Sequence, residues 1–477
     1  MREHDRFYIG GGWVAPTGTA TIDVISPHTE EVVGRVPDGA PADIDRAVAA
    51  ARDAFDNGPW PRLAPVERAD AVAKLAELYA ARQSDMAELI TEEMGSPILF
   101  SQLAQAPFPQ MMLSYFAELA RTYDWEEERQ GMLGPVTVRR EPVGVVAAIV
   151  PWNVPQFVSM SKLAPALVAG CTIVLKPAPE TPLDAYLFAE LVEEAGIPGG
   201  VVNIVPAGRE TGEHLVSHPG VDKVAFTGST AAGRRIAAIC GERLRRCSLE
   251  LGGKSAAVIC DDADLAMTME GLKMASLMNN GQACAAQTRI LAPRSRYDEV
   301  ADALASMVGG LTVGDPGDMS TEIGPLVAKR QQDRVEGYIK LGQDEGAKVI
   351  AGGLSRPYDR GWYVTPTVFG DVDNSMRIAR EEIFGPVLAL IPYEDEADAV
   401  RIANDSEYGL GGSVWTADVD RGADIARRIR TGSCGVNMYI IDVNTPFGGY
   451  KASGIGRELG PEGLTAYVEH KALARPA

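Results

Sequence analysis

Apolar residues along this chain recur in two blocks that alternate between strand and helix patterns. Between residues 143 and 252, continuously apolar runs such as VGVVAAIV and TIVLKP are followed by helical stretches, two of which end at Gly170 and Gly196. Apolar runs without polar alternation are typical of parallel strands that are covered on both faces. A second block of the same kind extends from about residue 255 to residue 445. The alternation predicts two doubly wound α/β domains.

Two further segments lie outside these blocks. The first 120 residues contain strand-like pieces at 7–9, 21–25 and 32–36, and we expect two amphipathic helices after them. The first of these helices has apolar residues at steps of three and four between positions 44 and 55, which is the spacing of one helical face. Residues 121–142 are polar and partly alternating, with a Gly-Pro turn. That pattern predicts a projecting hairpin.

Composition excludes several classes of protein. The chain has 477 residues, of which 46% are hydrophobic, and a formal net charge of -20. The length suggests two or three domains, and the acidity argues against nucleic acid as a partner because phosphate binding requires a basic surface. The first residues lack the apolar region of a secretory signal, and the longest apolar run, 143–152, is too short to span a bilayer. We therefore expect no membrane partner.

The cysteines indicate a reducing environment and one candidate nucleophile. Six cysteines without a CxxC pair, standing apart from the five histidines, form neither a disulfide framework nor a metal-binding pattern. We expect a cytoplasmic protein with no metal site. Cys284 follows a polar stretch at 279–282 that breaks a helix, and there it would be exposed enough to attack a carbonyl carbon as a thiolate. The remaining cysteines fall in strand or helix patterns and are interpreted as structural: Cys171, Cys240, Cys247, Cys260 and Cys434.

Three other positions are candidates for chemistry, each with a simpler alternative. Asn153 stands between two prolines at the end of an apolar strand; it could donate to an oxyanion or only complete a turn. Glu250 ends another apolar strand, where it is either a general base with a raised pKa or a satisfied structural carboxylate. The segment FTGST at 226–230 joins a strand to a helix without the GxGxxG pattern. Its small residues would admit a phosphate at the helix N-terminus, or simply cap the helix.

Seven short segments occur in an order that resembles the aldehyde dehydrogenase superfamily over essentially the whole chain. Any one of them is a weak signal, but the combination is highly specific. The separation of 34 residues between Glu250 and Cys284 also fits the spacing of base and nucleophile in that family. The segments are PWN at 151–153, KPA at 176–178, FTGS at 226–229, ELGGKS at 250–255, GQAC at 281–284, EEIFGP at 381–386 and PFGGYKASGIGRE at 446–458.

The resemblance implies catalytic roles for five residues. Cys284 would form a thiohemiacetal with an aldehyde and then a thioester. Asn153, together with the backbone N–H of Cys284, would hold the oxyanion. Glu250 would activate the water that hydrolyses the thioester, and Lys162 and Glu458 would relay protons from that base. Because relatives that transfer the acyl group to coenzyme A generally lack this base, the chain is expected to release a free carboxylate.

The resemblance also implies a site for NAD. Lys176 would bind the adenine ribose, Glu382 the nicotinamide ribose and Phe384 the nicotinamide, while Trp152 and Ser229 would contact the pyrophosphate. The full set of implied coenzyme-binding residues is Trp152, Lys176, Gly228, Ser229, Gly252, Glu382 and Phe384.

One departure from the family pattern concerns the choice of coenzyme. Many NAD-preferring members carry a glutamate three residues after the ribose-binding lysine, where it repels a 2′-phosphate. Here that position is Pro179, and Glu180 comes one residue later. We favour NAD, with NADP as the alternative.

The substrate is expected to be an uncharged aliphatic or aromatic aldehyde. The segments that match the wall of the family's access tunnel are mostly apolar and contain no arginine that could bind a substrate carboxylate. Ser161 replaces a bulky aromatic residue of some relatives, which predicts a roomy tunnel. An alternative is a dehydrogenase for a specific metabolic semialdehyde that uses NADP, and a non-enzymatic scaffold would be expected to lack Cys284, Glu250 or Asn153. The expected wall residues are Val154, Phe157, Val158, Ser161, Met278 and Ile441.

The resemblance finally implies a division of the chain into three parts. Residues 1–123 and 143–252 would form a Rossmann-like coenzyme-binding domain, to which 453–467 returns. Residues 253–452 would form the catalytic domain. Segments 124–142 and 468–477 would form an oligomerisation extension by strand pairing between subunits. We expect a homo-oligomer, a tetramer first and a dimer second.

Overall fold

An eight-stranded sheet organises the N-terminal half of the computed structural model, which describes residues 1–476. Its strand order is β20-β12-β11-β8-β9-β10-β2-β3. The five central strands are parallel, and β20 and β2 pair antiparallel at the two sides. Successive strands run outward in opposite directions from the β8–β11 pair, so a crevice opens at the carboxyl ends of these strands. The strands are β2 (Phe7–Ile9), β3 (Gly12–Val14), β8 (Val145–Ile149), β9 (Thr172–Lys176), β10 (Val202–Ile204), β11 (Lys223–Thr227), β12 (Arg246–Glu250) and β20 (Gly454–Ile455).

Helices cover both faces of this sheet because its strands are apolar on both sides. In β8, Val145 and Ala147 pack with one set of helices, whereas Val146 and Ala148 pack with the other. The first set is α1 (Pro41–Asp56), α8 (Arg209–Ser217) and α9 (Thr230–Glu242). The second set is α2 (Pro65–Ala81), α3 (Gln83–Met94), α5 (Pro107–Thr122), α6 (Pro155–Ala169) and α7 (Leu183–Ala195), with the short α4 (Ile98–Phe100) and α16 (Gly460–Thr465) nearby.

The expectation of two helices in the first 120 residues is wrong, because α1, α2, α3 and α5 all lie there. α2 and α3 are separated by Arg82 alone, so their apolar positions read as one continuous stretch in the sequence. A π-helical turn at Ser101–Gln105 then leads into α5. Such turns are rare and often occur near functional sites.

A seven-stranded sheet organises the second half, in the order β15-β16-β17-β14-β13-β18-β19. All neighbours are parallel except β15 and β16. Its strands are β13 (Ala256–Ile259), β14 (Arg289–Pro293), β15 (Lys348–Ala351), β16 (Thr367–Gly370), β17 (Val387–Tyr393), β18 (Gly412–Trp415) and β19 (Gly435–Val436). α10 (Leu265–Leu277) and α11 (Tyr297–Gly309) cover one face. The other face is covered by α12 (Lys329–Asp344), α13 (Arg377–Arg380), α14 (Glu396–Asn404) and α15 (Val419–Arg428). Both predicted α/β sheets are therefore present.

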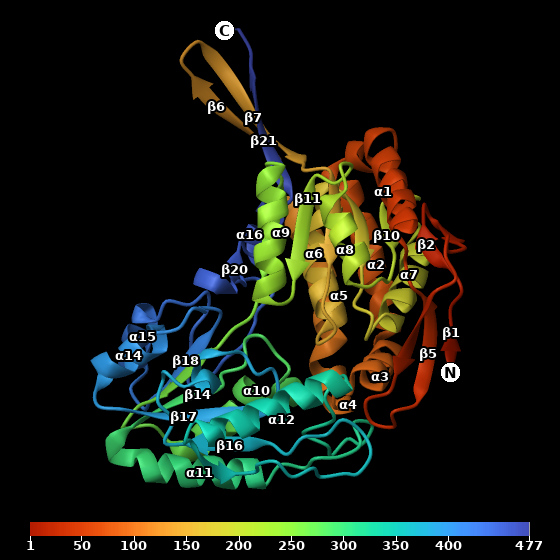
Figure 1. The fold of residues 1–477 in the computed structure, drawn as a ribbon. Helices are drawn as coiled ribbons and strands as arrows, with labels where there is room; N and C mark the ends of the chain where they lie inside the picture. The colour runs from red at the N-terminus through yellow and green to blue at the C-terminus, as the bar shows by residue number, and fades with distance from the viewer. Residues whose placement is uncertain (477) are drawn as a thin grey trace.

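A three-stranded antiparallel ribbon stands away from the body of the molecule, with the C-terminal strand along one side (Figure 1). It consists of β6 (Glu126–Gly131), β7 (Gly134–Pro142) and β21 (Val468–Ala474). The hairpin is present as predicted, but its tip is Met132-Leu133, since Gly134 and Pro135 already belong to β7. Position 477 of the predicted extension lies outside the described residues. A small separate sheet pairs β1 (Arg2–Glu3), β5 (Val32–Pro37) and β4 (Thr21–Ile25).

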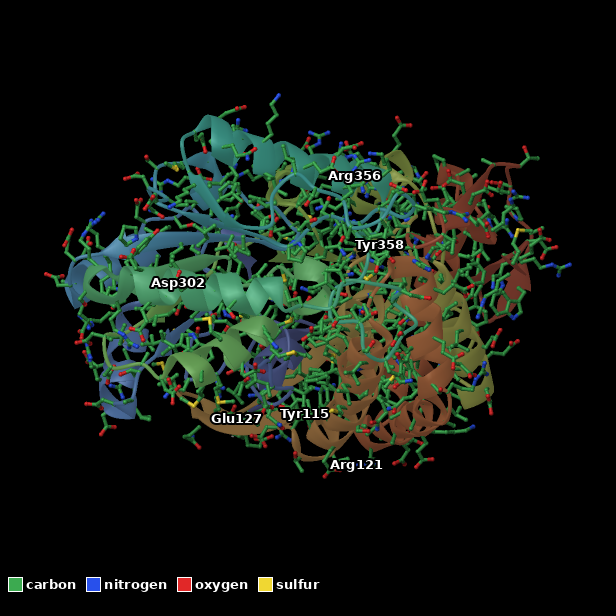
Figure 2. All side chains as sticks on the ribbon, turned by 90° about the horizontal axis from the view of Figure 1, so that it is seen from below. Tyr115, Arg121, Glu127, Asp302, Arg356 and Tyr358 are labelled. Carbon is green, nitrogen blue, oxygen red and sulfur yellow. The ribbon has the colours of Figure 1, made fainter. Side chains whose placement is uncertain are left out.

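Charged side chains cover the outside of the molecule, where Arg121, Asp302 and Arg356 are all exposed (Figure 2). Within residues 1–476, every helix falls short of the length and apolarity that a bilayer crossing requires.

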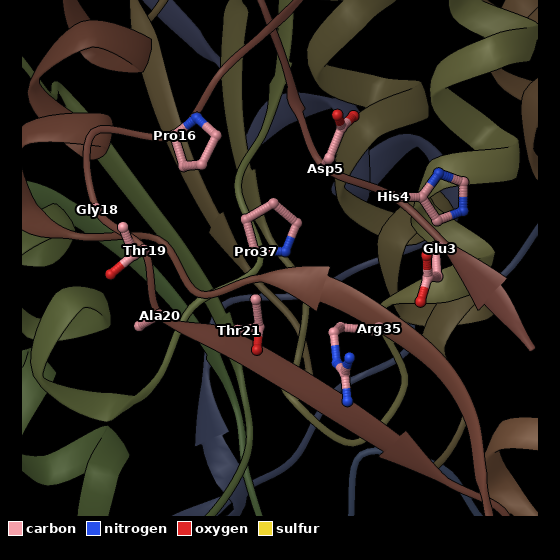
Figure 3. A pocket seen from close by; sticks show the side chains of 10 residues that line it. All are labelled: Glu3, His4, Asp5, Pro16, Gly18, Thr19, Ala20, Thr21, Arg35 and Pro37. Carbon is pink, nitrogen blue, oxygen red and sulfur yellow. The ribbon is translucent and has the colours of Figure 1, made fainter.

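Two surface cavities of about 310 and 450 Å³ lie beside the N-terminal strand. The first is lined by Glu3, His4 and Arg35 among others (Figure 3). Neither cavity includes a predicted site residue.

Candidate active site

Four neighbouring strands of the eight-stranded sheet bring predicted site residues to one edge. Asn153 follows β8, Lys176 ends β9, Ser229 follows β11 and Glu250 ends β12. Because parallel strands present their carboxyl ends at the same edge, residues almost 100 positions apart in the chain become neighbours. This is the edge at which the strand order reverses.

Cys284 approaches the same edge from the other half of the molecule. α10 ends at Leu277, and Asn279 and Asn280 then adopt left-handed backbone angles that turn the chain towards β14. The carbonyl oxygen of Cys284 lies so close to Gly253 that a β-carbon there would come within 2.4 Å of it. The segment after Glu250 and the Cys284 loop are therefore packed backbone against backbone.

The thiol of Cys284 is less exposed than its loop position suggested. The residue is half-buried, and burial, with the carboxylates of Glu382 and Glu250 nearby, raises the pKa of its thiol to about 12. The sequence correctly indicated a loop, but it could not show that the loop is enclosed by both sheets. At neutral pH the thiol is therefore protonated in the free protein.

Modification of Cys284 is expected to depend steeply on pH. Because the raised pKa leaves very little thiolate at pH 7, the rate of alkylation by iodoacetamide should rise about tenfold per pH unit from pH 7 to 10. Removing a neighbouring negative charge with Glu382→Gln should lower the pKa of the thiol and speed alkylation several-fold at pH 8. Peptide mass spectrometry of Cys284 would measure both rates.

The matched control is Glu381→Gln. The Glu381 carboxylate is bound by Arg377 and Tyr338 and does not contribute to the raised pKa of Cys284. Its replacement should leave the alkylation rate unchanged. A rate that levels off near pH 8 in the wild type would contradict the raised pKa.

Four of the other cysteines lie in or directly beside a strand or helix, whereas the prediction for Cys434 was wrong. Cys240 lies in α9 and Cys247 in β12, while Cys171 and Cys260 directly adjoin β9 and β13. Cys434 was predicted to lie in a regular element, but it occupies a loop before β19 and is half-buried. The preceding helix, α15, already ends at Arg428, and β19 begins only at Gly435.

Asn153 contacts the loop that carries Cys284. It is 4% exposed, and its Nδ2 donates a hydrogen bond of 2.8 Å to the carbonyl of Gln282, two residues before Cys284. An asparagine amide carries two N–H donors. One is used to fix the side chain, and the second remains for another acceptor.

Glu250 is buried without a hydrogen-bond partner. It is 3% exposed, and neither of its carboxyl oxygens has a partner within the described residues. Gly448 makes room for it, since a β-carbon there would come within 2.6 Å of Oε1. Burial, and secondarily the Glu458 carboxylate, raises the pKa of Glu250 well above its usual value, against the opposing charges of Lys162 and Arg457. An unpaired buried carboxyl with a raised pKa has the properties of a general base.

Lys162 and Glu458 form an ion pair next to Glu250. Their Nζ and Oε1 atoms are 2.5 Å apart, and Lys162 is fully buried. Lys162 also donates to Thr227 Oγ1 at 2.7 Å, and Ser161 donates to Glu458 Oε2 at 2.6 Å. The expectation that Ser161 lines a roomy tunnel is therefore wrong, because the residue is 1% exposed and its hydroxyl is bound to Glu458. Its position on the side of α6 facing Glu458 could not be read from the sequence.

Glu382 and Phe384 reach the edge from the loop between α13 and β17. Glu382 Oε1 accepts a hydrogen bond of 2.9 Å from the backbone N–H of Gly253, and a β-carbon at Gly252 would come within 2.7 Å of the same carboxylate. Burial raises the pKa of Glu382. The ring of Phe384 packs edge-on against Trp152, with centroids 5.4 Å apart.

Lys176 and the start of α9 complete this group. Lys176 is 6% exposed, and its Nζ donates to the carbonyls of Pro177 and Ala207 at 2.9 and 2.6 Å. Burial lowers the pKa of Lys176 to about 8. Ser229 caps α9 by accepting from Ala232 N, and Gly228 precedes it. Glu180 is paired with Arg330 at 2.6 Å.

The predicted residues suit a dinucleotide coenzyme. A carboxylate and an ammonium group suit ribose hydroxyls, and a helix N-terminus preceded by small residues suits a diphosphate. The edge-on Trp152 and Phe384 rings offer an apolar wall for a flat heterocycle. Within residues 1–476, no group of three His, Cys, Asp or Glu side chains is arranged to hold a metal ion.

Most of the residues predicted for the substrate tunnel pack on the same core cluster as Cys284. Val154, Phe157 and Ile441 are partly buried against the same core cluster as Cys284. Val158 instead lies within that core and is 6% exposed. Phe108 on α5 packs against Phe157 with ring centroids 6.0 Å apart. No motif marks Phe108, since the pattern around it is that of any amphipathic helix.

Two α/β sheets that bring a thiol, an amide and a buried carboxyl close together are the features of an α/β enzyme, and a thiol in such a group can serve as a nucleophile. The family model described as "Aldehyde dehydrogenase family" matches residues 13–473. The chain belongs to the aldehyde dehydrogenase family.

Individual relatives match over the full length of the chain. It is 51% identical to the geranial dehydrogenase of Castellaniella defragrans, over 99% of this chain and 98% of the relative. A crystal structure of Mycobacterium tuberculosis aldehyde dehydrogenase in complex with NAD+ is 51% identical, with a TM-score of 0.98 and coverage of 100% and 99% of the two chains. A Pseudomonas syringae aldehyde dehydrogenase variant in complex with NAD+ and octanal is 42% identical, with a TM-score of 0.95 and coverage of 98% and 96%.

Proposed function

We propose that this protein oxidises an uncharged, apolar aldehyde to the free carboxylic acid with NAD. The observation that carries the proposal is the grouping of Cys284, Asn153 and Glu250: Asn153 is hydrogen-bonded to the loop that carries Cys284, and the unpaired buried carboxyl of Glu250 contributes to the raised pKa of the Cys284 thiol. The family membership supports aldehyde oxidation. The two relatives in complex with NAD+ support the coenzyme.

The chemistry begins at the sulfur of Cys284. The thiol first releases its proton to water. As the thiolate it then attacks the aldehyde carbon, the C=O π electrons move to oxygen, and the second N–H of Asn153 stabilises the resulting oxyanion together with the backbone N–H of Cys284. NAD, when bound, supplies the acceptor for the hydride that leaves this carbon. What remains on Cys284 is a thioester.

Hydrolysis of the thioester falls to Glu250. Its carboxylate takes a proton from a water molecule, the oxygen attacks the thioester carbon, and the sulfur of Cys284 leaves as thiolate. The Lys162–Glu458 pair next to Glu250 accepts that proton and returns the base to its ionised form. The acid product then leaves the site.

Coenzyme binding is assigned to the residues that gather at the sheet edge. Lys176 would hold the adenine ribose, the N-terminus of α9 with Gly228 and Ser229 would hold the diphosphate, and Glu382 beside Gly252 would hold the nicotinamide ribose. Phe384 and Trp152 would contact the nicotinamide. Glu180 is engaged by Arg330, so discrimination against NADP depends on how close that pair lies to the ribose.

The apolar residues that pack on the same core cluster as Cys284 suggest the class of substrate. Val154, Phe157 and Ile441 carry no charge, and a relative that is 51% identical is a geranial dehydrogenase. Another relative binds octanal. We therefore place the substrate among medium-length aliphatic or terpenoid aldehydes.

A coenzyme-reduction assay tests this proposal. We expect reduced NAD to appear with octanal and geranial, with a kcat/KM at least about tenfold above that for succinic semialdehyde, because the residues predicted to line the substrate tunnel include no cation that could bind a carboxylate. NAD should give a higher kcat/KM than NADP. A preference for the carboxylated aldehyde, or for NADP, would contradict the corresponding part of the proposal.

The division into parts and the assembly follow from the sheets. We assign coenzyme binding to the eight-stranded sheet, the nucleophile to the seven-stranded sheet and subunit pairing to the ribbon, whose β6 edge and exposed tip have no partner within the described residues. An isolated ribbon is marginally stable, so a homotetramer, or else a dimer, in a reducing cytoplasm is expected. Light scattering of the purified protein should give a mass of four chains, and a single-chain mass would contradict the assignment.

A further inference from the structure

A chain of buried amides ties Asn153 to segments that no motif identifies. Asn279 Nδ2 donates a hydrogen bond of 2.8 Å to the backbone carbonyl of Asn153. In the opposite direction, Asn153 Nδ2 donates to the carbonyl of Gln282. The loop that carries Cys284 and the loop that follows β8 are thus joined twice, once from each side.

Gln105 extends this chain to the π-helical turn. Its Nε2 donates to Asn279 Oδ1 at 3.3 Å and to Ser96 Oγ at 2.8 Å. Since Gln105 supplies the donor, Oδ1 of Asn279 is the acceptor, and the Asn279 amide group is left pointing at Asn153. Gln105, Asn279 and Ser96 are no more than 2% exposed, so water does not compete for these bonds.

Unusual backbone conformations at Asn279 and before Gln105 support these hydrogen-bonded amides. Asn279 has a φ of 54°, a left-handed angle that asparagine adopts more readily than most residues. A wide π turn at Ser101–Gln105 carries Gln105 to the interior. These two features bring the amide of Gln105 next to the amide of Asn279, which lies 174 residues later in the sequence.

We propose that Gln105 and Asn279 are positioning residues that hold Asn153 in register with Cys284. The inference rests on the proposed function, in which the second N–H of Asn153 stabilises an oxyanion on the carbon bound to Cys284. A donor of this kind must be held within about 0.5 Å of its working position to be effective. The double tie between the two loops holds it there before substrate arrives.

Two variants remove different hydrogen bonds from this series of buried amides. Gln105→Leu keeps the approximate volume but removes the donor, and Asn279→Gly keeps the left-handed backbone but removes the side chain. We expect each variant to lower kcat/KM for octanal by about tenfold to 100-fold. This fall should not exceed the one caused by removing the oxyanion donor itself. The Kd for NAD and the rate of Cys284 alkylation by iodoacetamide should change less than about twofold, because neither depends on an oxyanion donor.

Asn280→Gly is the matched control. Asn280 has the same left-handed backbone and burial, but its side chain binds Gly95, Pro325 and Gly324 and not the amide chain. Damage that is only structural should lower aldehyde turnover and alkylation together in this variant. The ratio of the two rates is therefore the quantity to compare, alongside the Tm of each protein.

A double-mutant cycle with Asn153→Ala decides whether the chain acts through Asn153. If it does, Asn279→Gly should cost less than about twofold in the Asn153→Ala background, because there is no donor left to position. Equal losses in the two backgrounds, or parallel losses of turnover and alkylation, would overturn the proposal. Absence of aldehyde turnover in the wild type would overturn the proposed function as well, and would be distinguishable because alkylation persists.

Discussion

Replacement of Cys284 by alanine is expected to lower kcat/KM for any aldehyde by about four orders of magnitude or more. The proposed route forms a covalent bond to this sulfur before hydride leaves, so removing the atom removes the route rather than weakening it. Binding of NAD should persist, since the proposed coenzyme contacts come from other residues. Absorbance of the reduced coenzyme measures turnover, and fluorescence titration measures the Kd for NAD.

The control for this substitution is Cys434→Ala. Cys434 is also half-buried and also lies in a loop, but it has no part in the proposed chemistry. Its replacement should leave kcat/KM within about twofold of the wild type. Substantial aldehyde oxidation by the Cys284→Ala protein would refute covalent catalysis at this residue.

Replacement of Glu250 by glutamine is expected to separate the two halves of the reaction. The glutamine has nearly the same shape but cannot accept a proton from water, so steady-state turnover should fall by about 100-fold to 10,000-fold. Formation of the thioester should survive. We expect a rapid burst of about one reduced coenzyme per subunit, followed by slow turnover.

Mass spectrometry of the intact Glu250→Gln protein detects the expected thioester directly. During the slow phase, the acyl group should be found as a mass increase on Cys284. Glu381→Gln, a change of the same kind at a carboxylate bound to Arg377, should show neither the burst nor the adduct. Loss of the burst together with turnover would place Glu250 before hydride transfer and contradict its assignment to hydrolysis.

The raised pKa of Glu250 also predicts the direction of the pH dependence. A base works only when ionised, and its pKa lies well above the usual 4.5 because of burial and the Glu458 charge. The hydrolytic step of the wild type should therefore rise with pH and be lost as the pH falls through this raised value. In Glu250→Gln this acid limb should disappear from the slow phase.

Much of the fold was predictable because it depends on local patterns. Runs such as VVAAI in β8 and TIVLK in β9 have no polar alternation, and this alone indicates strands covered on both faces. The hairpin at 126–142 follows from polar alternation. The strand order was not predictable in this way, and neither was the number of helices before residue 123, because α2 and α3 have no break between them beyond Arg82.

The features of the candidate site also fall into two groups, those that follow from local sequence patterns and those that depend on tertiary packing. By itself the sequence determined which residue types stand at strand ends and loops: Asn153 after β8, Glu250 at the end of β12 and Cys284 after a broken helix. These are local properties of chain patterning. Only the tertiary structure decided that the thiol is enclosed, that Ser161 binds Glu458 instead of lining a tunnel, and that Gln105 reaches Asn279. Each of these depends on side-chain direction and on packing between segments more than 100 residues apart, and no local pattern of apolar and polar residues encodes either one.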